Sequence, residues 1–167
     1  MSRSLTIGFL VLLSVCSINL ANAQDSSRIV EKIYADIDSE FMSSNINVFR
    51  HYSDDAVIVS ERGYVMRPSQ LKEGMEKIIR AGVKVEISQS KILNIKELRS
   101  SVMNTLIGVV VQSDNFERIS APDDKDKTKR LSRESRSITT RVFDTSDPSK
   151  KWVIVSQQST AMPASEK

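Results

Sequence analysis

The apolar residues of this chain change their spacing once, close to residue 83, and this change limits the folds that the chain can adopt. Before that point, apart from a short hairpin over about 56–66, apolar side chains recur every three or four residues, which is typical of helices with one buried face. After it, stretches of alternating or continuous apolar residues predict consecutive strands. Helices followed by strands favour an α+β fold, with helices on one face of a mostly antiparallel sheet, over a parallel doubly wound sheet.

Three helices are expected before the change. The buried stripe of the first helix consists of Val30, Ile33, Tyr34, Ile37 and Phe41. A short second helix is expected over about 46–52. Pro68 suits the first turn of a third helix, because the backbone N–H that proline lacks would have no partner there. Gly82 can adopt the left-handed conformation that ends this helix.

The expected strands begin with a hairpin that turns at Glu61–Gly63 and continue with four longer strands. These cover 83–98, 102–112, 135–144 and 151–160, and the first of them is expected to be bent or bulged. The densely charged segment Glu117–Arg136 mixes both signs and has no aromatic residue, which indicates a solvated loop. A strongly curved, mixed but mostly antiparallel sheet, closed by the three helices of the N-terminal half, would form a cone that encloses a cavity.

The first residues predict a secretory signal peptide at 1–23. Arg3 is followed by the apolar run Leu5–Cys16, and small residues precede a cleavage site after Ala23. The apolar run is shorter than the roughly 20 residues that a membrane span needs, so cleavage is favoured over a stable membrane anchor. The expected product is a secreted or periplasmic protein with one domain, residues 24–167.

Composition argues against several classes of function. The one cysteine, Cys16, lies in the predicted signal peptide, so the mature chain would form neither a disulfide nor a thiolate zinc site. The chain has 24 basic and 21 acidic residues, and the loss of Arg3 with the signal peptide leaves 23 against 21, which is nearly neutral. A nucleic-acid-binding protein normally has a strong basic patch with aromatic residues near it, and no such patch is visible in this sequence.

Two segments near the end of the chain, Thr140–Phe143 and Trp152–Pro163, resemble the closing hairpin of nuclear transport factor 2-like proteins. The SnoaL-like group and the association domain of calcium/calmodulin-dependent protein kinase II often close with a T-R-V-[WF] strand and a W-x-I-V-H-x-H-x-S strand. The helix–turn–strand order over 49–60 also fits this pattern. The resemblance implies a cone-shaped domain with a cavity, which often forms a homodimer through its sheet.

The resemblance also implies ligand-binding residues. Arg141 matches the pocket arginine of the kinase association domain, and its planar guanidinium could bind a carboxylate through two hydrogen bonds. Ser156 and Gln158 stand where the family pattern often has histidine, and neither moves a proton near neutral pH. In a regular strand, one face would carry Trp152, Ile154, Ser156, Gln158 and Thr160. Tyr34 could direct its hydroxyl into the cavity. For Arg141, the alternative is a strand arginine that pairs with a neighbouring acid or is exposed. For the last strand, it is an ordinary change from core to rim, and for Tyr34 it is a position in the core.

Residues for acid–base chemistry are few. The single histidine, His51, follows the second helix, and a surface or half-buried position is favoured over a catalytic one. No metal-ligand spacing and no phosphate-binding or cofactor motif occurs, so neither a metal nor a cofactor is expected. In a catalytic cavity, Tyr34 or Tyr64 would donate a hydrogen bond beside one of three carboxylates. These are Asp36, Asp38 and Glu61.

Together these observations favour binding over catalysis. We expect a non-catalytic secreted or periplasmic domain that self-associates as a homodimer and holds a small, anionic ligand in its cone. The alternative is a cofactor-free isomerase, dehydratase or cyclase, in which burial would raise the pKa of one carboxylate in the cavity. Only the mixed-charge segment favours a nucleic-acid or membrane-surface partner, and neither is expected.

Overall fold

The computed structural model describes residues 25–147 and 151–163, and the predicted signal peptide lies outside them. The chain divides into two compact units, residues 1–32 and 33–167. In the first unit, residues 25–32 are helical, and this N-terminal helix continues to residue 42 in the second unit. Within the described part of the chain, no helix combines the length and the apolar character needed to cross a membrane.

Two further helices follow in the second unit. The 3-10 helix η1 covers Ile46–His51, and the side chain of Asn45 caps it by accepting a hydrogen bond of 3.0 Å from the backbone N–H of Asn47. Helix α2 covers Pro68–Arg80 and begins with the proline that predicts its first turn. Gly82 follows it with a φ of +78°, the left-handed conformation expected of a residue that ends a helix.

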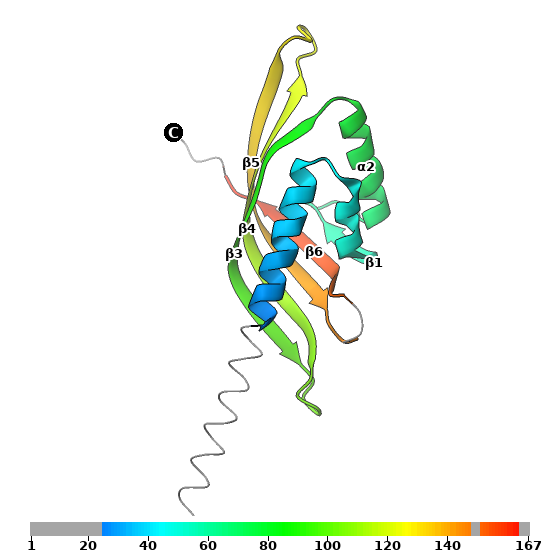
Figure 1. The fold of residues 1–167 in the computed structure, drawn as a ribbon, viewed down its shortest axis with the longest axis vertical. Helices are drawn as coiled ribbons and strands as arrows, with labels where there is room; N and C mark the ends of the chain where they lie inside the picture. The colour runs from blue at the N-terminus through cyan, green and yellow to red at the C-terminus, as the bar shows by residue number, and fades with distance from the viewer. Residues whose placement is uncertain (1–24, 148–150, 164–167) are drawn as a thin grey trace, which may run out of the picture. The chain divides into compact units, whose positions relative to one another are not determined.

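Six strands form one sheet in the order β2-β1-β6-β5-β4-β3 (Figure 1). They are β1 Tyr52–Val59, β2 Val65–Met66, β3 Lys84–Arg99, β4 Leu106–Pro122, β5 Arg130–Asp144 and β6 Val153–Ala161. Strand β1 runs parallel to β6, and the other neighbouring pairs are antiparallel. The predicted α+β fold with a mixed, mostly antiparallel sheet is therefore confirmed.

The segment 117–136 is not the solvated loop that its charge predicts. Strands β4 and β5 take up most of it, and only 123–129 connect them. Opposite charges face each other across the two strands, as where the Nε of Arg118 donates to Oε1 of Glu134 at 2.9 Å. Such pairs stabilise a charged hairpin, and a reading along the segment alone does not detect them.

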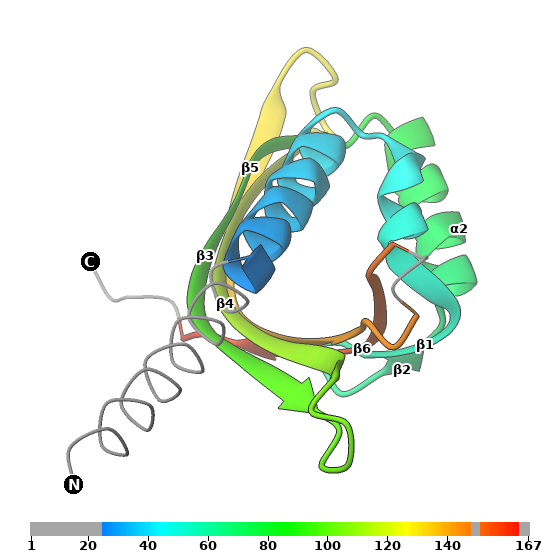
Figure 2. The same cartoon turned by 60° about the horizontal axis from the view of Figure 1, so that its bottom comes forward.

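Strand β3 is bent, as its apolar pattern predicts. Its pairing with β4 shifts register at three places, before Ile87, Asn94 and Arg99. Register shifts of this kind bend a strand and increase its twist. The sheet curves around η1, α2 and the second unit's part of the N-terminal helix, which lie on its concave side (Figure 2).

The core of the second unit lies between the helices and the concave face of the sheet. Tyr34 and Ile37 of the predicted helical stripe are only 2 % and 1 % exposed. From the sheet, the fully buried apolar side chains include Val109, Val111, Phe143 and Ile154. Burial of apolar surface at roughly 25 cal/mol per Å² is the main force that holds these elements together.

Candidate functional site

A cavity of about 540 Å³ lies between the sheet and the helices of the second unit. Its apolar wall comes mainly from the helices and includes Phe41, Phe49, Leu71, Met75, Ile78 and Ile79. Its polar wall comes from β4, β5 and β6 and includes Asn115, Glu117, Ser137, Thr139, Arg141, Gln157 and Ser159. Cavities that bind small molecules span roughly 300–1,000 Å³, and one apolar and one polar wall suit an amphipathic ligand.

Arg141, the predicted ligand-binding arginine, lies on β5 and lines the cavity with only 6 % of its surface exposed. Its Nε donates a hydrogen bond to Oε1 of Gln157 at 2.7 Å, and its Cζ lies 4.8 Å from the centre of the Tyr34 ring. Its Nη1 is buried without a hydrogen-bond partner among the described residues, and no described carboxylate forms an ion pair with it. A guanidinium in this state can accept an anionic oxygen as its partner.

The Arg141 side chain keeps its positive charge although it is buried. Burial by itself lowers the pKa of Arg141, but the neighbouring Tyr52 and Tyr34 outweigh this effect, and the resulting pKa lies above the ordinary value. Because little water surrounds the guanidinium, its attraction for an anion is stronger than it would be at the protein surface. The polar wall therefore carries a permanent positive charge.

The predicted ligand-binding residues of the last strand, Ser156 and Gln158, are not among the residues that line the cavity. Their neighbours Gln157 and Ser159 line it instead. The predicted inward face of β6 is therefore wrong beyond the middle of the strand. The prediction failed because it assumed an unbroken alternation of side chains along the strand.

A β-bulge in β6 reverses its two faces. In the pairing of β5 with β6, Val142 lies opposite Ser156, whereas Phe143 lies opposite Ile154, so Val155 is an extra residue. An extra residue moves every following side chain to the other face of the sheet. The apolar Ile154, which precedes the bulge, is buried, and the inward positions after the bulge are Gln157 and Ser159.

Tyr34 lies beside the site but does not line the cavity. Its ring packs against Phe143, with the two ring centres 6.4 Å apart, and supports the guanidinium of Arg141. Its hydroxyl accepts a hydrogen bond of 3.4 Å from Ser113 Oγ. Tyr34 therefore occupies the core position that the sequence left open, and its contribution to the site is to hold Arg141 in place.

Glu117 lines the cavity and was missed in the sequence, where it stands at the start of the predicted loop. Burial is the main cause that raises the pKa of its carboxyl, Glu61 and Asp38 raise it further, and Arg141 acts in the opposite direction. Glu117 as a whole residue is exposed to solvent, so water screens these effects and exchanges protons with the carboxyl. Extending the alternation of β4 from Val109 by steps of two would have placed Glu117 on the inward face.

The carboxylates and the tyrosine that the sequence offered for catalysis are spread over the unit. Glu61 lines the cavity, whereas Asp36 and Asp38 do not. Asp38 is engaged in hydrogen bonds to β3. Tyr64 lies outside the cavity wall and is 63 % exposed. In the described ranges, no three His, Cys, Asp or Glu side chains come together in a group that could hold a metal ion.

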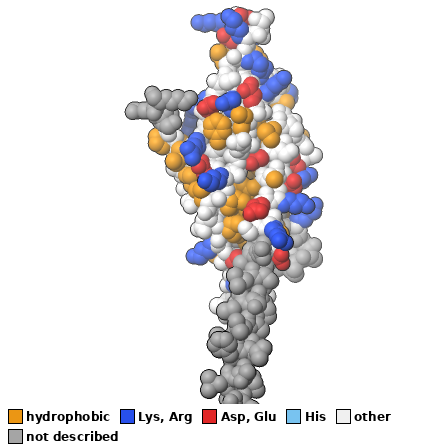
Figure 3. Space-filling view, turned by 60° about the vertical axis from the view of Figure 1, so that its left-hand side comes forward, with side chains coloured by type: hydrophobic (Ala, Val, Ile, Leu, Met, Phe, Trp, Pro, Cys, Tyr) orange, Lys and Arg blue, Asp and Glu red, His pale blue; other side chains and the backbone are white. Residues whose placement is uncertain are grey.

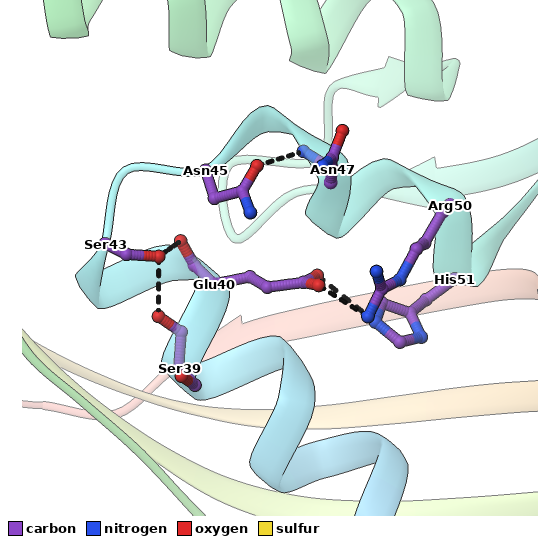
Figure 4. A network of polar contacts seen from close by, with 7 residues as sticks. All are labelled: Ser39, Glu40, Ser43, Asn45, Asn47, Arg50 and His51. Atoms are coloured by element: carbon purple, nitrogen blue, oxygen red, sulfur yellow. Dashed lines mark hydrogen bonds and ion pairs between the residues drawn. The ribbon is translucent and has the colours of Figure 1, made fainter.

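His51 has an acidic partner that the sequence did not reveal (Figure 4). Its Nε2 lies 3.2 Å from Oε2 of Glu40, and Oε1 of Glu40 lies 2.6 Å from Nη2 of Arg50. The sequence favours a surface or half-buried histidine, whereas the structure leaves His51 only 9 % exposed, with Glu40 reaching it from the N-terminal helix. Neither Glu40 nor His51 lines the cavity, so the pair is separate from the candidate ligand site.

His51 predicts a loss of stability in mild acid. Burial lowers the pKa of His51 from its ordinary value of 6.5, against an opposing effect of Glu40. Its contribution to stability is therefore complete above pH 6.5 and is lost as the pH falls from 6.5 toward the lowered pKa of the folded state. We expect His51→Gln to reduce the fall in Tm between pH 7.5 and 5.5, measured by circular dichroism. An equal fall in both proteins would contradict this assignment.

No protein-family model matches the sequence, and comparison with curated proteins finds no relative. Solved structures share its fold. A ketosteroid isomerase-like protein from Erwinia carotovora atroseptica has a TM-score of 0.61 at 12 % identity, with 82 % of this chain and 96 % of that chain covered. A nuclear transport factor 2-like protein of unknown function from Prochlorococcus has a TM-score of 0.60 at 13 % identity, with 83 % and 94 % covered.

A third structure is a protein assigned as a calcium/calmodulin-dependent kinase II association domain, from Exiguobacterium sibiricum. Its TM-score is 0.61 at 9 % identity, with 84 % of this chain and 95 % of that chain covered. Identities this low show the fold alone. The fold is that of nuclear transport factor 2-like proteins, as the closing strands of the sequence indicate.

Proposed function

We propose that this protein binds a small amphipathic anion without acting on it, with the apolar part against the helices and the anionic group against Arg141. The observation that supports this most is the buried guanidinium, which lines the cavity without an acidic partner among the described residues. A buried charge without a partner destabilises a fold, and an anionic ligand would offset this effect. A monocarboxylate with an alkyl or aryl body has the required chemistry.

Calorimetric titration with decanoate tests this proposal, and a variant that fills the cavity is its control. Gly74 lines the cavity from α2, and a Cβ added there meets no atom within 4 Å. Gly74→Phe should therefore be tolerated in the helix, where most residues are more favourable than glycine, and its ring would occupy the cavity. We expect the parent protein to bind decanoate and Gly74→Phe to lose this binding.

A matched variant separates cavity filling from a general effect of an added ring. Lys77 lies on the same helix, is exposed and does not line the cavity. Lys77→Phe should bind decanoate as the parent does. Failure of the parent to bind decanoate, or unchanged binding in Gly74→Phe, would contradict the proposed function.

Glu117 predicts that the affinity for decanoate rises as the pH falls from 8 toward the raised pKa of its carboxyl. At high pH its ionised carboxyl lies in the same cavity as the ligand's negative charge, and the two repel each other. Protonation of Glu117 removes part of this repulsion, and its pKa is raised above the ordinary carboxyl value near which the ligand itself titrates. Glu117→Gln should bind decanoate more tightly at pH 8 and flatten the pH dependence.

The control for this prediction is Glu86→Gln, a change at an exposed residue of β3 that does not line the cavity. It should keep the pH dependence of the parent protein in calorimetric titrations. A parent protein and a Glu117→Gln variant with parallel affinity curves would exclude Glu117 from the ligand site.

A second candidate function also depends on Glu117. We infer as the alternative a cofactor-free isomerase, dehydratase or cyclase, in which this carboxyl, with its pKa raised in a largely apolar cavity, would take a proton from the substrate. Incubation with 2-decanone in D₂O, followed by NMR, discriminates the two functions. Deuterium uptake next to the carbonyl that is lost in Glu117→Gln would favour the enzyme, whereas no uptake above the buffer rate would favour binding alone.

We also propose that the protein self-associates through the outer face of the sheet. Apolar side chains lie between charged ones on that side of the molecule (Figure 3). Large apolar residues of the two strands at that end of the sheet are exposed, with Leu93 of β3 at 48 % and Ile107 of β4 at 45 %. Light scattering at micromolar concentration should give the mass of a dimer, and a monomer alone would contradict the proposal.

Export of the chain is likewise a proposal, supported by the signal-like pattern of residues 1–23. We expect the mature protein to begin at Gln24. Mass spectrometry of the product released by an exporting cell tests this expectation, and an intact N-terminus in that product would contradict it.

A further inference from the structure

We propose that Gln157 and Arg141 together form a two-donor site for a carboxylate, and that Tyr52 is a positioning residue that sets the direction of the Gln157 amide. This inference rests on the proposed binding function and names the chemical class of the ligand's polar group. The residues come from three adjacent strands, β1, β6 and β5. Gln157 does not stand out in the sequence, because the bulge in β6 decides which side chains of that strand face the cavity.

The Gln157 amide is oriented by two donors. Its Oε1 accepts a hydrogen bond from the Tyr52 hydroxyl and another from Nε of Arg141, each at 2.7 Å. A carboxamide has one oxygen that accepts hydrogen bonds and one NH₂ group that only donates them. Because the oxygen is engaged twice, the NH₂ group remains to donate, and no described residue accepts a hydrogen bond from it.

Arg141 supplies the second donor. It lies directly opposite Gln157 in the pairing of β5 with β6, and both side chains line the cavity. Its Nη1 is buried and has no partner among the described residues. This end of the cavity therefore presents donors from both residues, and a group with two acceptor oxygens satisfies them. A carboxamide or an alcohol would bring a donor of its own against these donors.

Tyr52 keeps this arrangement in place. It begins β1, lies opposite Ile154 in the parallel pairing with β6 and is only 8 % exposed. Without its hydroxyl, Oε1 of Gln157 would have Arg141 as its one donor. The amide could then turn and present its oxygen to the ligand, where it would repel a carboxylate. Tyr52 also lines the cavity, and its hydroxyl favours an anionic ligand by fixing the direction of the Gln157 amide.

The test compares decanoate with decanamide, its neutral isostere, by calorimetric titration. We expect the parent protein to bind decanoate at least about tenfold more tightly than decanamide. Gln157→Glu replaces the NH₂ donor with a carboxylate oxygen beside the guanidinium, which would repel the ligand's carboxylate, and we expect it to remove this preference. Gln158→Glu, the same change one residue later and outside the cavity, should retain the preference.

Tyr52→Phe removes only the hydroxyl. We expect it to weaken decanoate binding about threefold to tenfold and to leave decanamide binding unchanged, a difference that a merely structural role would not produce. An equal loss for both ligands would overturn the positioning role of Tyr52. If Gln157→Glu does not fold by circular dichroism, Gln157→Leu should still lower the preference for decanoate, and an unchanged preference would overturn the role of Gln157.

The outcomes separate this inference from the proposed function. Equal affinities of the parent protein for decanoate and decanamide would overturn the two-donor site and leave cavity binding intact. Binding of neither compound would overturn the proposed function itself.

Discussion

Replacing Arg141 with methionine is expected to weaken decanoate binding by at least about tenfold. Methionine keeps an unbranched side chain in the cavity wall, but it removes the charge and the donors that would meet the carboxylate. A hydrogen bond to a charged group contributes roughly 1.5–3 kcal/mol, which corresponds to a change of about 10- to 150-fold in Kd. Calorimetric titration of Arg141→Met and of the parent protein measures this change.

A second arginine of the same strand is the matched control. Arg136 lies on β5 but pairs with Asp114 and does not line the cavity. Arg136→Met should therefore bind decanoate as the parent does. An equal loss in the two variants would mean that the ligand responds to net charge, and unchanged affinity in Arg141→Met would remove this arginine from the site.

The fold should tolerate the loss of Arg141. Replacing a buried charge with an apolar side chain of similar length is often neutral or stabilising, because folding then no longer has to remove a charge from water. We therefore expect Arg141→Met to unfold at a Tm no lower than that of the parent protein in the absence of ligand. This result would show that the buried charge is retained for a purpose other than stability.

Replacing Asp38 with alanine is expected to lower the free energy of unfolding by about 2–4 kcal/mol. Asp38 accepts hydrogen bonds from Oγ of Ser88 at 2.8 Å, from the backbone N–H of Ser90 at 2.8 Å and from Oγ of Ser90 at 2.9 Å. These hydrogen bonds connect the N-terminal helix to β3. The variant would leave the three donors of Ser88 and Ser90 without this acceptor. Urea denaturation measures the change, which corresponds to a fall of roughly 5–15 °C in Tm.

Asp36 provides the control for this prediction. It is half-buried on the same helix, and the structure shows no hydrogen bond from a described residue to its carboxylate. Asp36→Ala removes the same negative charge from the same helix and should change the unfolding free energy by less than about 1 kcal/mol. Similar losses in the two variants would mean that charge, and not the hydrogen bonds to β3, determines the effect.

The hydrophobic spacing of the chain predicted most of its elements. Three of these features depend only on interactions within a few residues. They are the apolar stripe that contains Tyr34 and Ile37, the proline at the start of α2 and the left-handed Gly82 after it. Such interactions are present in the sequence itself. For this reason the order of helices and strands was predicted well, and the α+β class followed from it.

The candidate site was predicted less well, because its composition depends on pairing between strands. Arg141 was predicted from the family resemblance of the closing strands, and its strand β5 pairs with β4 without a register shift. Ser156 and Gln158 were chosen in place of Gln157 and Ser159, because the extra residue in β6 becomes visible only when the strand is paired with β5.

Local spacing therefore determined the type and order of the elements, whereas Arg141 was predicted from the family resemblance of the closing strands. The tertiary structure alone decided which side chains join Arg141. Glu117 lines the cavity because β4 continues through a segment whose charges resemble those of a loop, and His51 lies beside Glu40 because the N-terminal helix and η1 meet. Contacts between segments far apart in the chain have no periodic trace in the sequence, because their energies arise only when the segments are brought together.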